Sequence, residues 1–251
     1  MQLSVEIFFN FMAPHLKLIC YQVSKNTQMN NLAKYIDHTL LKPTATEMDF
    51  RKLCEEIYQN SFYSACVPPY YVSFVKELLE FSDAKICTVI GFPLGFQTTE
   101  VKIAEAQNAL DDGANELDIV MNISAFKSMA YETVKQEIKT LAELAHTRNA
   151  LIKVIIETAY LDNFDIRIAC EICEEAGADF IKTSTGFANK GADLEQVKLI
   201  REVLPSSIQI KASGGIQTYE QAIAFIEAGA TRLGTSSGVA IVSEGVGYSG
   251  Y

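Results

Sequence analysis

Three stretches of the chain share one pattern: "DDGANELDIV" (residues 111–120), "EEAGADFIKT" (174–183) and "IEAGATRLGT" (226–235). Each closes a segment of helical period, places a glycine directly after it and enters a short β-type run within a few residues. Glycine adopts the left-handed conformation of a helix C-cap at the lowest cost, because it has no Cβ. The three stretches therefore predict equivalent joints between a helix and the strand that follows it.

The same unit extends along the chain in both directions. Short apolar runs predict eight strands, "YIDHTL", "FYSACV", "KICTVIGF", "NELDIVM", "LIKVIIE", "DFIKTS", "IQIKAS" and "TRLGTS". Amphipathic segments predict helices at 46–59, 101–112, 131–147, 164–177, 193–204 and 219–229. Eight parallel strands with crossover helices indicate an α/β fold of one domain, a closed (β/α)8 TIM barrel. A doubly wound open sheet is the alternative, but the chain lacks a glycine-rich loop after its first strand.

Composition limits the possible partners. A net charge of −10 and a pI near 4.9 argue against a general nucleic-acid or membrane surface, although a local nest of amides can still bind a small phosphate. The six cysteines (20, 54, 66, 87, 170 and 173) are scattered and most lie in apolar segments, which predicts reduced thiols and a cytoplasmic protein.

The two ends do not follow the repeat. We divide the chain into a poorly structured extension (1–28), a (β/α)8 barrel (29–240) and a mobile tail (241–251). The extension contains an apolar patch, but its first charge is Glu6, so neither a signal peptide nor a membrane span is favoured. A start at Met29 is a further possibility.

Four ionisable residues stand in the middle of predicted strands: Asp118, Lys153, Lys182 and Lys211. Side chains alternate between the faces of a strand, and the inward positions of neighbouring strands converge near the axis of a barrel. We expect the four to form one cluster at the catalytic end. The alternative is that each lysine extends from a strand end to solvent.

Adjacent ammonium groups have a chemical use. At ~4 Å and an effective dielectric near 20 their repulsion is about 4 kcal/mol, which lowers a lysine pKa by roughly three units. The resulting neutral amine can form a Schiff base with a carbonyl substrate, and a carboxylate such as Asp118 can relay protons.

Two loops predict a phosphate site. "ASGGIQT" (212–218) follows the seventh strand and "GTSSGVA" (234–240) follows the eighth, where many barrels bind phosphate. Backbone amides and hydroxyls are suitable ligands, although glycine and serine pairs are also common in ordinary turns. The candidate phosphate ligands are Gly186, Gly214, Gly215, Gly234, Ser236 and Ser237.

Six ordered motifs carry a resemblance to a known family. The chain from about Asn31 to Gly238 contains "YIDHTLLKP", "ELDIVMN", "LIKVIIET", "AGADFIKTSTGF", "KASGGI" and "GTSSG", and resembles the deoxyribose-phosphate aldolases. The resemblance implies a class I aldolase, a lyase of deoxyribonucleotide and deoxynucleoside breakdown. It would reversibly cleave 2-deoxy-D-ribose 5-phosphate into D-glyceraldehyde 3-phosphate and acetaldehyde, without metal or organic cofactor. We expect a homo-oligomer, a dimer or a tetramer, with no nucleic-acid or membrane partner.

The resemblance also assigns roles. It makes Lys182 the Schiff-base lysine, Lys211 its pKa-tuning neighbour and Asp118 the proton donor and acceptor. It places Asp37, Thr39, Cys66 and Lys153 near the substrate, although Cys66 is equally well read as a small buried filler. Family members often end in a tyrosine that assists proton transfer, and the corresponding residue is Tyr251, in a tail that would otherwise be called disordered.

Several features depart from the family or point elsewhere. Some relatives carry a basic residue where this chain has Phe187 and an arginine where it has Gln217, so we expect a weaker preference for phosphorylated sugars. Cys170 and Cys173 form a Cys-x-x-Cys pair inside a helical segment, which favours core packing over zinc or redox chemistry. The histidines 15, 38 and 146 lack metal-site spacing, and His38 should point outward from its strand. Another Schiff-base aldolase and a non-catalytic sugar-phosphate-binding barrel remain the alternatives.

Overall fold

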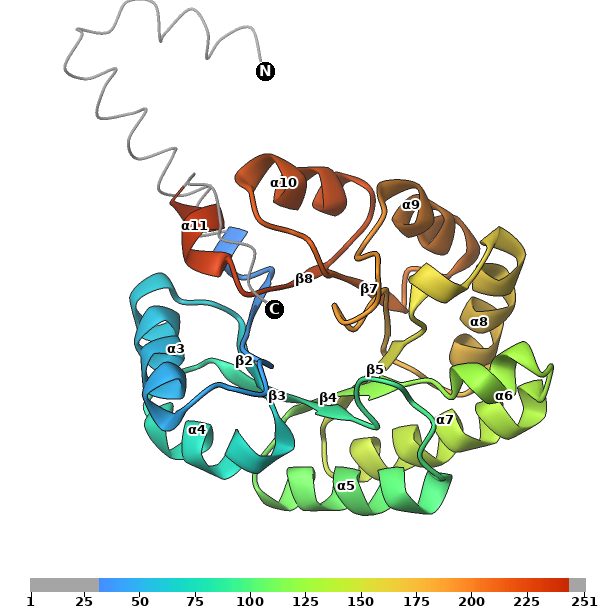
Figure 1. The fold of residues 1–251 in the computed structure, drawn as a ribbon, viewed down its shortest axis with the longest axis horizontal. Coiled ribbons are helices and arrows are strands. Elements are labelled where there is room, and N and C mark those ends of the chain that lie inside the picture. Colours follow the sequence, from blue (N-terminus) through green and yellow to red (C-terminus); the bar gives the residue numbers. More distant parts are fainter. Residues whose placement is uncertain (1–31, 244–251) are drawn as a thin grey trace, which may run out of the picture.

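The computed structural model describes residues 32–243, which contain a closed barrel of eight parallel strands paired in sequence order. Figure 1 shows the strands around the barrel axis and the helices as a ring outside them. The strands are β1 (Ile36–Thr39), β2 (Ser64–Val67), β3 (Lys85–Ile90), β4 (Glu116–Val120), β5 (Leu151–Ile155), β6 (Phe180–Lys182), β7 (Gln209–Ser213) and β8 (Arg232–Thr235). The predicted (β/α)8 TIM barrel is confirmed, and the open sheet is excluded.

Helices connect consecutive strands. They are α3 (Glu47–Asn60), α4 (Val72–Leu78), α5 (Thr99–Asp111), α6 (Ile123–Lys127), α7 (Tyr131–Thr147), α8 (Asn163–Glu175), α9 (Leu194–Val203), α10 (Tyr219–Glu227) and α11 (Gly238–Val242), with 3-10 turns at Pro69–Tyr71 and Thr158–Tyr160. The six helices predicted from their period are all present. Three helices were not predicted: α4, α6 and α11. They have seven, five and five residues and are too short to show a helical hydrophobic period.

The joints that define the repeat have the predicted conformation. Gly113, Gly177 and Gly229 follow α5, α8 and α10 with φ of 105°, 82° and 110°. At Gly229 a Cβ would also lie 2.7 Å from the side chain of Arg201, so a larger residue would be both strained and crowded. Each glycine therefore ends its helix and turns the chain into the next strand.

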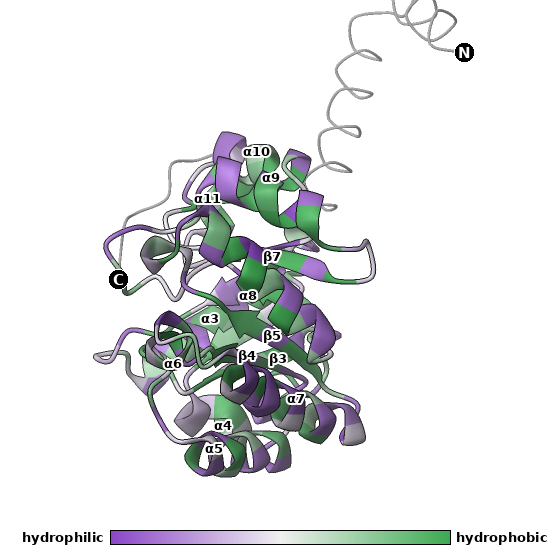
Figure 2. Ribbon diagram, turned by 90° about the vertical axis from the view of Figure 1, so that its right-hand side faces the viewer, coloured by the Kyte–Doolittle hydropathy of each residue, from purple (hydrophilic) through white to green (hydrophobic). Residues whose placement is uncertain are grey.

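The two faces of the strands differ in character. The outward residues of β5 to β7, such as Ile152, Val154 and Ile210, are buried in the apolar layer beneath the helices. Figure 2 shows helices that combine hydrophobic and hydrophilic residues, as expected for helices with one face on this layer. The inward residues are largely polar or charged, so the apolar layer stabilises the fold and the interior is available for chemistry.

The predicted domain boundaries lie near the two ends of the barrel. The boundary predicted at residue 28 and the tail tyrosine lie outside the described residues, while α11 crosses the boundary predicted at residue 240. None of the described helices has the length and apolar character needed to cross a bilayer.

Candidate active site inside the barrel

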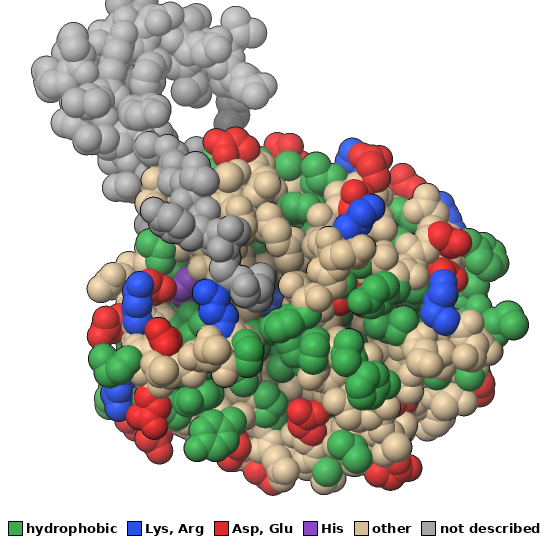
Figure 3. All heavy atoms as spheres, in the orientation of Figure 1, with side chains coloured by type: hydrophobic (Ala, Val, Ile, Leu, Met, Phe, Trp, Pro, Cys, Tyr) green, Lys and Arg blue, Asp and Glu red, His purple; other side chains and the backbone are tan. Residues whose placement is uncertain are grey.

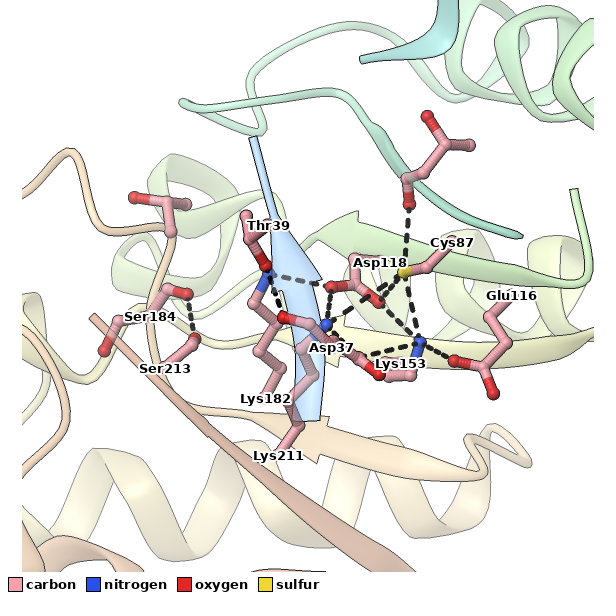
Figure 4. Close-up of polar contacts among 12 residues, drawn as sticks. Asp37, Thr39, Cys87, Glu116, Asp118, Lys153, Lys182, Ser184, Lys211 and Ser213 are labelled. Atoms are coloured by element: carbon pink, nitrogen blue, oxygen red, sulfur yellow. Dashed lines mark hydrogen bonds and ion pairs between the residues drawn. The ribbon is translucent and has the colours of Figure 1, made fainter. Parts of the chain in front are cut away.

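Strand register brings the four predicted charges together. Asp118 of β4 is aligned with Lys153 of β5, and Lys182 of β6 is aligned with Lys211 of β7. All four side chains are buried and point into the barrel, where Figure 4 shows them directed toward one another. The predicted cluster is thus present, and none of these lysines extends to solvent.

Asp118 is the centre of the cluster. Its Oδ2 accepts hydrogen bonds from Lys182 Nζ at 2.8 Å and Lys211 Nζ at 2.7 Å, and its Oδ1 accepts one from Lys153 Nζ at 2.8 Å. Burial alone would raise the pKa of Asp118, but the three ammonium groups outweigh it and hold that pKa well below its ordinary value. Asp118 is therefore an ionised carboxylate that contacts both lysines of the predicted catalytic pair.

Lys182 and Lys211 differ in their surroundings. Lys211 Nζ also contacts Asp37 Oδ2; burial alone would lower the pKa of Lys211, but Asp118 and Asp37 raise it well above its ordinary value. Within the described residues Lys182 has one carboxylate partner, Asp118. Because both ammonium groups donate to the same oxygen, they lie close together, as predicted, but the carboxylate between them offsets part of their repulsion.

A second ring of charges supports this cluster from within the barrel. Glu116 Oε2 lies 2.6 Å from Lys153 Nζ and 3.0 Å from Arg232 Nη1, and Arg232 Nη1 also donates to Asp37 Oδ1 at 2.7 Å. The guanidinium of Arg232 stacks on Tyr63, with 3.5 Å from Cζ to the ring centroid. Glu116 and Arg232 were not among the predicted site residues. Glu116 stands two residues before Asp118, whose inward position was predicted, so strand alternation was a usable signal for Glu116.

The ion-pair network contains charges of both signs. Among the described residues, the cations of the network are Lys153, Lys182, Lys211 and Arg232, and its carboxylates are Asp37, Glu116 and Asp118. Four cations therefore face three carboxylates, and this near balance limits the uncompensated charge in a buried site.

Two cysteines border the cluster. Cys66 of β2 and Cys87 of β3 are aligned neighbours, and Cys87 Sγ lies 3.2 Å from Asp118 Oδ1 and 3.3 Å from Lys153 Nζ. A hydrogen bond with Cys87 lowers the pKa of Cys66 to about 7 against the effect of burial, whereas burial raises the pKa of Cys87. Cys66 is fully buried beside Cys87, and Cys87 is an additional residue that we did not single out.

Asp37 and Thr39 occupy β1 on the opposite side of the cluster. Asp37 is completely buried; Ser64 Oγ donates to its Oδ1 at 2.6 Å, and Arg232, Lys211 and Lys153 hold its pKa far below the ordinary value although burial opposes them. The Thr39 hydroxyl donates to the Asp37 carbonyl at 2.8 Å. Tyr251 lies outside the described residues.

Two of the turns that contain predicted phosphate residues approach each other. Gly186 and Gly214 both have positive φ, 88° and 87°, and a Cβ on Gly214 would lie 3.5 Å from the Cα of Gly186. Gly215 has a φ of 79°; Ser236 is half-buried, and the amide of Ser237 donates to Thr235 Oγ1 at 2.9 Å. Gly234 has a further explanation, because a Cβ there would lie 3.0 Å from Cε of Lys211. The absence of a side chain at Gly234 therefore makes room for that lysine.

The rim of this face is partly apolar. Figure 3 shows hydrophobic side chains gathered beside the centre of the face seen in Figure 1. Phe92 and Phe187, from the loops after β3 and β6, pack edge to face with 5.2 Å between centroids, and Leu94 and Phe96 are exposed in the same loop as Phe92. Phe187 is thus one half of an aromatic pair at this rim.

The residues that we assigned to packing do pack. His38 points outward from β1 and its Nε2 lies 2.7 Å from Glu56 Oε2 of α3. Cys170 and Cys173 are free, buried thiols in α8 whose pKa values are raised by burial.

Two groups of side chains in the barrel interior have the spacing of metal ligands. Ligand atoms lie within 4.8 Å of one another in two described triads, Cys66 with Cys87 and Asp118, and Asp37 with Cys87 and Glu116. The carboxylates of both triads are already bound by lysine or arginine side chains. A divalent cation would have to displace those ammonium or guanidinium groups, so the donor set does not fit a metal.

A closed (β/α)8 barrel with buried lysines around a carboxylate defines an enzyme of the lysine-dependent barrel class. The family model described as DeoC/LacD family aldolase matches residues 31–244. This chain belongs to that family, and it is an aldolase, a carbon–carbon lyase.

Individual relatives agree with this membership. The chain is 55% identical over 214 residues to a protein of Thermococcus gammatolerans named deoxyribose-phosphate aldolase, covering 84% of this chain and 95% of that one. It is 49% identical over 223 residues to a protein of the same name from Caldanaerobacter subterraneus, covering 88% and 96%. Among solved structures, the deoxyribose phosphate aldolase of Aeropyrum pernix, described as having a unique tetrameric structure, superposes with a TM-score of 0.81 at 39% identity, covering 86% and 91%.

Proposed function

We propose that this protein is a deoxyribose-phosphate aldolase that cleaves 2-deoxy-D-ribose 5-phosphate through a Schiff base on Lys182. The observation that carries the proposal is the contact of Lys182 with Asp118 inside a buried network, in a chain of the DeoC/LacD aldolase family. The relatives' names supply the substrate, and the buried amine supplies the chemistry.

The proposed reaction uses the amine of Lys182 and the carboxylate of Asp118. The neutral amine of Lys182 attacks the aldehyde carbon of the open-chain sugar, and loss of water gives an iminium ion. Removal of the proton from the C3 hydroxyl breaks the C2–C3 bond, releasing glyceraldehyde 3-phosphate and leaving an enamine on Lys182. Protonation at C2 and hydrolysis release acetaldehyde. Asp118, with Lys211 beside it, holds and transfers the protons, since its Oδ2 contacts both amines.

Reductive trapping tests the covalent step. Incubation with acetaldehyde and borohydride should add an ethyl group to the peptide that contains Lys182, as read by mass spectrometry. Lys102 is the internal control, because it is equally buried but pairs with Glu137 on the outer side of the barrel. An unmodified Lys182 peptide would contradict the mechanism and favour a non-catalytic binding barrel.

The preference for a phosphorylated sugar depends on the charges near the phosphate turns. Phe187 and Gln217 provide no cation for the phosphate, and each charge-assisted hydrogen bond is worth about 1.5–3 kcal/mol. We expect kcat/KM for deoxyribose 5-phosphate relative to deoxyribose to be lower than in a relative with both cations, and Phe187→Lys to raise that ratio about tenfold or more. A ratio unchanged by Phe187→Lys would show that residue 187 does not face the phosphate.

The proposal extends to assembly and location. The tetrameric relative supports a homo-oligomer, and the buried free cysteines favour a reducing, cytoplasmic compartment.

A further inference from the structure

Glu157 follows β5 in an unusual backbone conformation. Its φ and ψ are 50° and 71°, in the left-handed region that a glutamate rarely adopts, and its side chain is 1% exposed. Such a conformation is strained, and residues that adopt it concentrate at functional sites. Neither the assigned catalytic roles nor the phosphate turns account for it.

The backbone on both sides of Glu157 is tied to β6 and its extension. Ile156 N donates to the Lys182 carbonyl at 3.0 Å, and Thr158 N donates to the Thr183 carbonyl at 2.8 Å. These two bonds enclose Glu157 and place it beside the turn that follows Lys182. The strained residue therefore sits at the strand end next to the proposed Schiff-base lysine.

The Glu157 carboxylate binds that turn directly. Its Oε2 accepts a hydrogen bond from Thr185 N at 3.1 Å and another from the Thr185 hydroxyl. Thr185 Oγ1 in turn accepts a hydrogen bond from Phe187 N at 3.1 Å. The side chain of Glu157 thus holds both neighbours of Gly186. It binds Thr185 directly, and it holds Phe187 through the Thr185 hydroxyl.

The opposite side of the turn is held by β7. Ser213 N donates to Thr183 Oγ1 at 3.1 Å, and Ser213 Oγ donates to the Ser184 carbonyl at 2.6 Å. The segment from Thr183 to Phe187 is consequently anchored on both sides. Glu157 supplies the anchor on the β5 side.

Glu157 also keeps acceptor capacity that the protein does not use. Within residues 32–243, Glu157 Oε1 and the neighbouring Thr158 Oγ1 are buried without a hydrogen-bond partner. Leaving a buried polar atom without a hydrogen bond is unfavourable, because the atom has lost its contacts with water. A purely structural clamp would not need this second oxygen, which is available to a water or to a substrate hydroxyl.

We propose that Glu157 is a positioning residue that fixes the Thr185–Phe187 turn and so aims the Gly186 amide at the substrate phosphate. The inference rests on the proposed function, because it concerns the same substrate. Loss of the side-chain oxygen that binds Thr185 should impair use of the phosphorylated sugar more than reaction of Lys182 with acetaldehyde, which carries no phosphate.

The test uses variants that separate positioning from folding. Glu157→Gly removes the side chain at a backbone conformation that glycine adopts without strain, and Thr185→Val removes the hydroxyl that joins the carboxylate to Phe187 N. Glu137→Gln is the matched control, since Glu137 is also a buried acid but binds Lys102 outside the barrel. The full-length protein is assayed for KM and kcat with deoxyribose 5-phosphate and deoxyribose, for borohydride trapping with acetaldehyde, and for thermal unfolding.

We expect Glu157→Gly to raise KM for deoxyribose 5-phosphate about tenfold, with the KM for deoxyribose and the trapping at Lys182 changed less than about threefold. Thr185→Val should give a similar loss, and the double variant should lose no more than the larger single effect. Glu157→Gln keeps an acceptor oxygen and should retain most of the affinity for deoxyribose 5-phosphate. Glu137→Gln should lower thermal stability without changing the ratio of the two KM values.

Two results would overturn the inference. One is an equal change for both sugars in Glu157→Gly, which would make Glu157 a general structural residue. The other is full additivity of Glu157→Gly and Thr185→Val. Wild-type protein that is not trapped at Lys182 would instead remove the proposed function itself, so the two failures are distinguishable.

Discussion

At the scale of single residues, Lys182 shares its carboxylate partner with a lysine on the neighbouring strand. Asp118 Oδ2 is shared between Lys182 and Lys211, and Lys211 has Asp37 as a second anionic partner. Lys211 therefore acts on Lys182 in two ways. It places a positive charge near Lys182, and it binds the Asp118 oxygen that would otherwise contact Lys182 alone.

Lys211→Leu should consequently raise the pH at which trapping of Lys182 is half-maximal. Removing the cation and freeing Asp118 both stabilise the ammonium form of Lys182, so a higher pH is needed to obtain the neutral amine. The measurement is the yield of ethylated Lys182 peptide against pH. Lys198→Leu, which removes an exposed lysine paired with Glu195, should leave the profile in place. An unshifted profile in Lys211→Leu would mean that burial rather than Lys211 tunes the amine.

Residue-level prediction succeeded where alternation along a strand was enough. The inward positions of Asp118, Lys153, Lys182 and Lys211 followed from a period of two, and the structure brings these side chains together. Glu157 had no comparable signal, because the bonds around it, from Thr158 N to the Thr183 carbonyl and from Thr185 N to its carboxylate, join residues that are distant in sequence. Strain of this kind arises only from tertiary structure.

At the scale of helices and strands, the sequence was informative wherever a segment was long enough to show its period. All eight strands and the six longer helices were predicted, and glycine marked three of the joints. Register was not predictable, because which residue of β6 faces Lys211 depends on the stagger of the closed barrel. A slip of one residue would turn Lys182 outward, so the site depends on a property that the periodicity of one strand cannot specify.

At the scale of the whole molecule, two layers have opposite roles. The apolar layer between strands and helices supplies the favourable burial, while the barrel interior holds ion pairs whose desolvation offsets much of their attraction. Hydrophobic content predicted the first layer. The size of the second could not be foreseen, because Glu116 and Arg232 join it only when β4 and β8 close onto the same axis.

The interior charges predict how stability depends on pH. Asp37 and Asp118 have folded-state pKa values far below their ordinary ones, so their contribution is fully present above about pH 4 and is lost as the pH falls and the unfolded chain takes up protons first. Lys153 and Lys211 have raised pKa values, so their contribution is fully present below about pH 10 and declines above it. We expect the free energy of unfolding, measured by denaturant titration, to fall toward acid by up to about 1.4 kcal/mol per pH unit for each of these carboxylates. Asp118→Asn should make the acid slope shallower, because one linked proton is removed. An equally steep slope in that variant would mean that surface carboxylates, rather than the barrel interior, control acid unfolding.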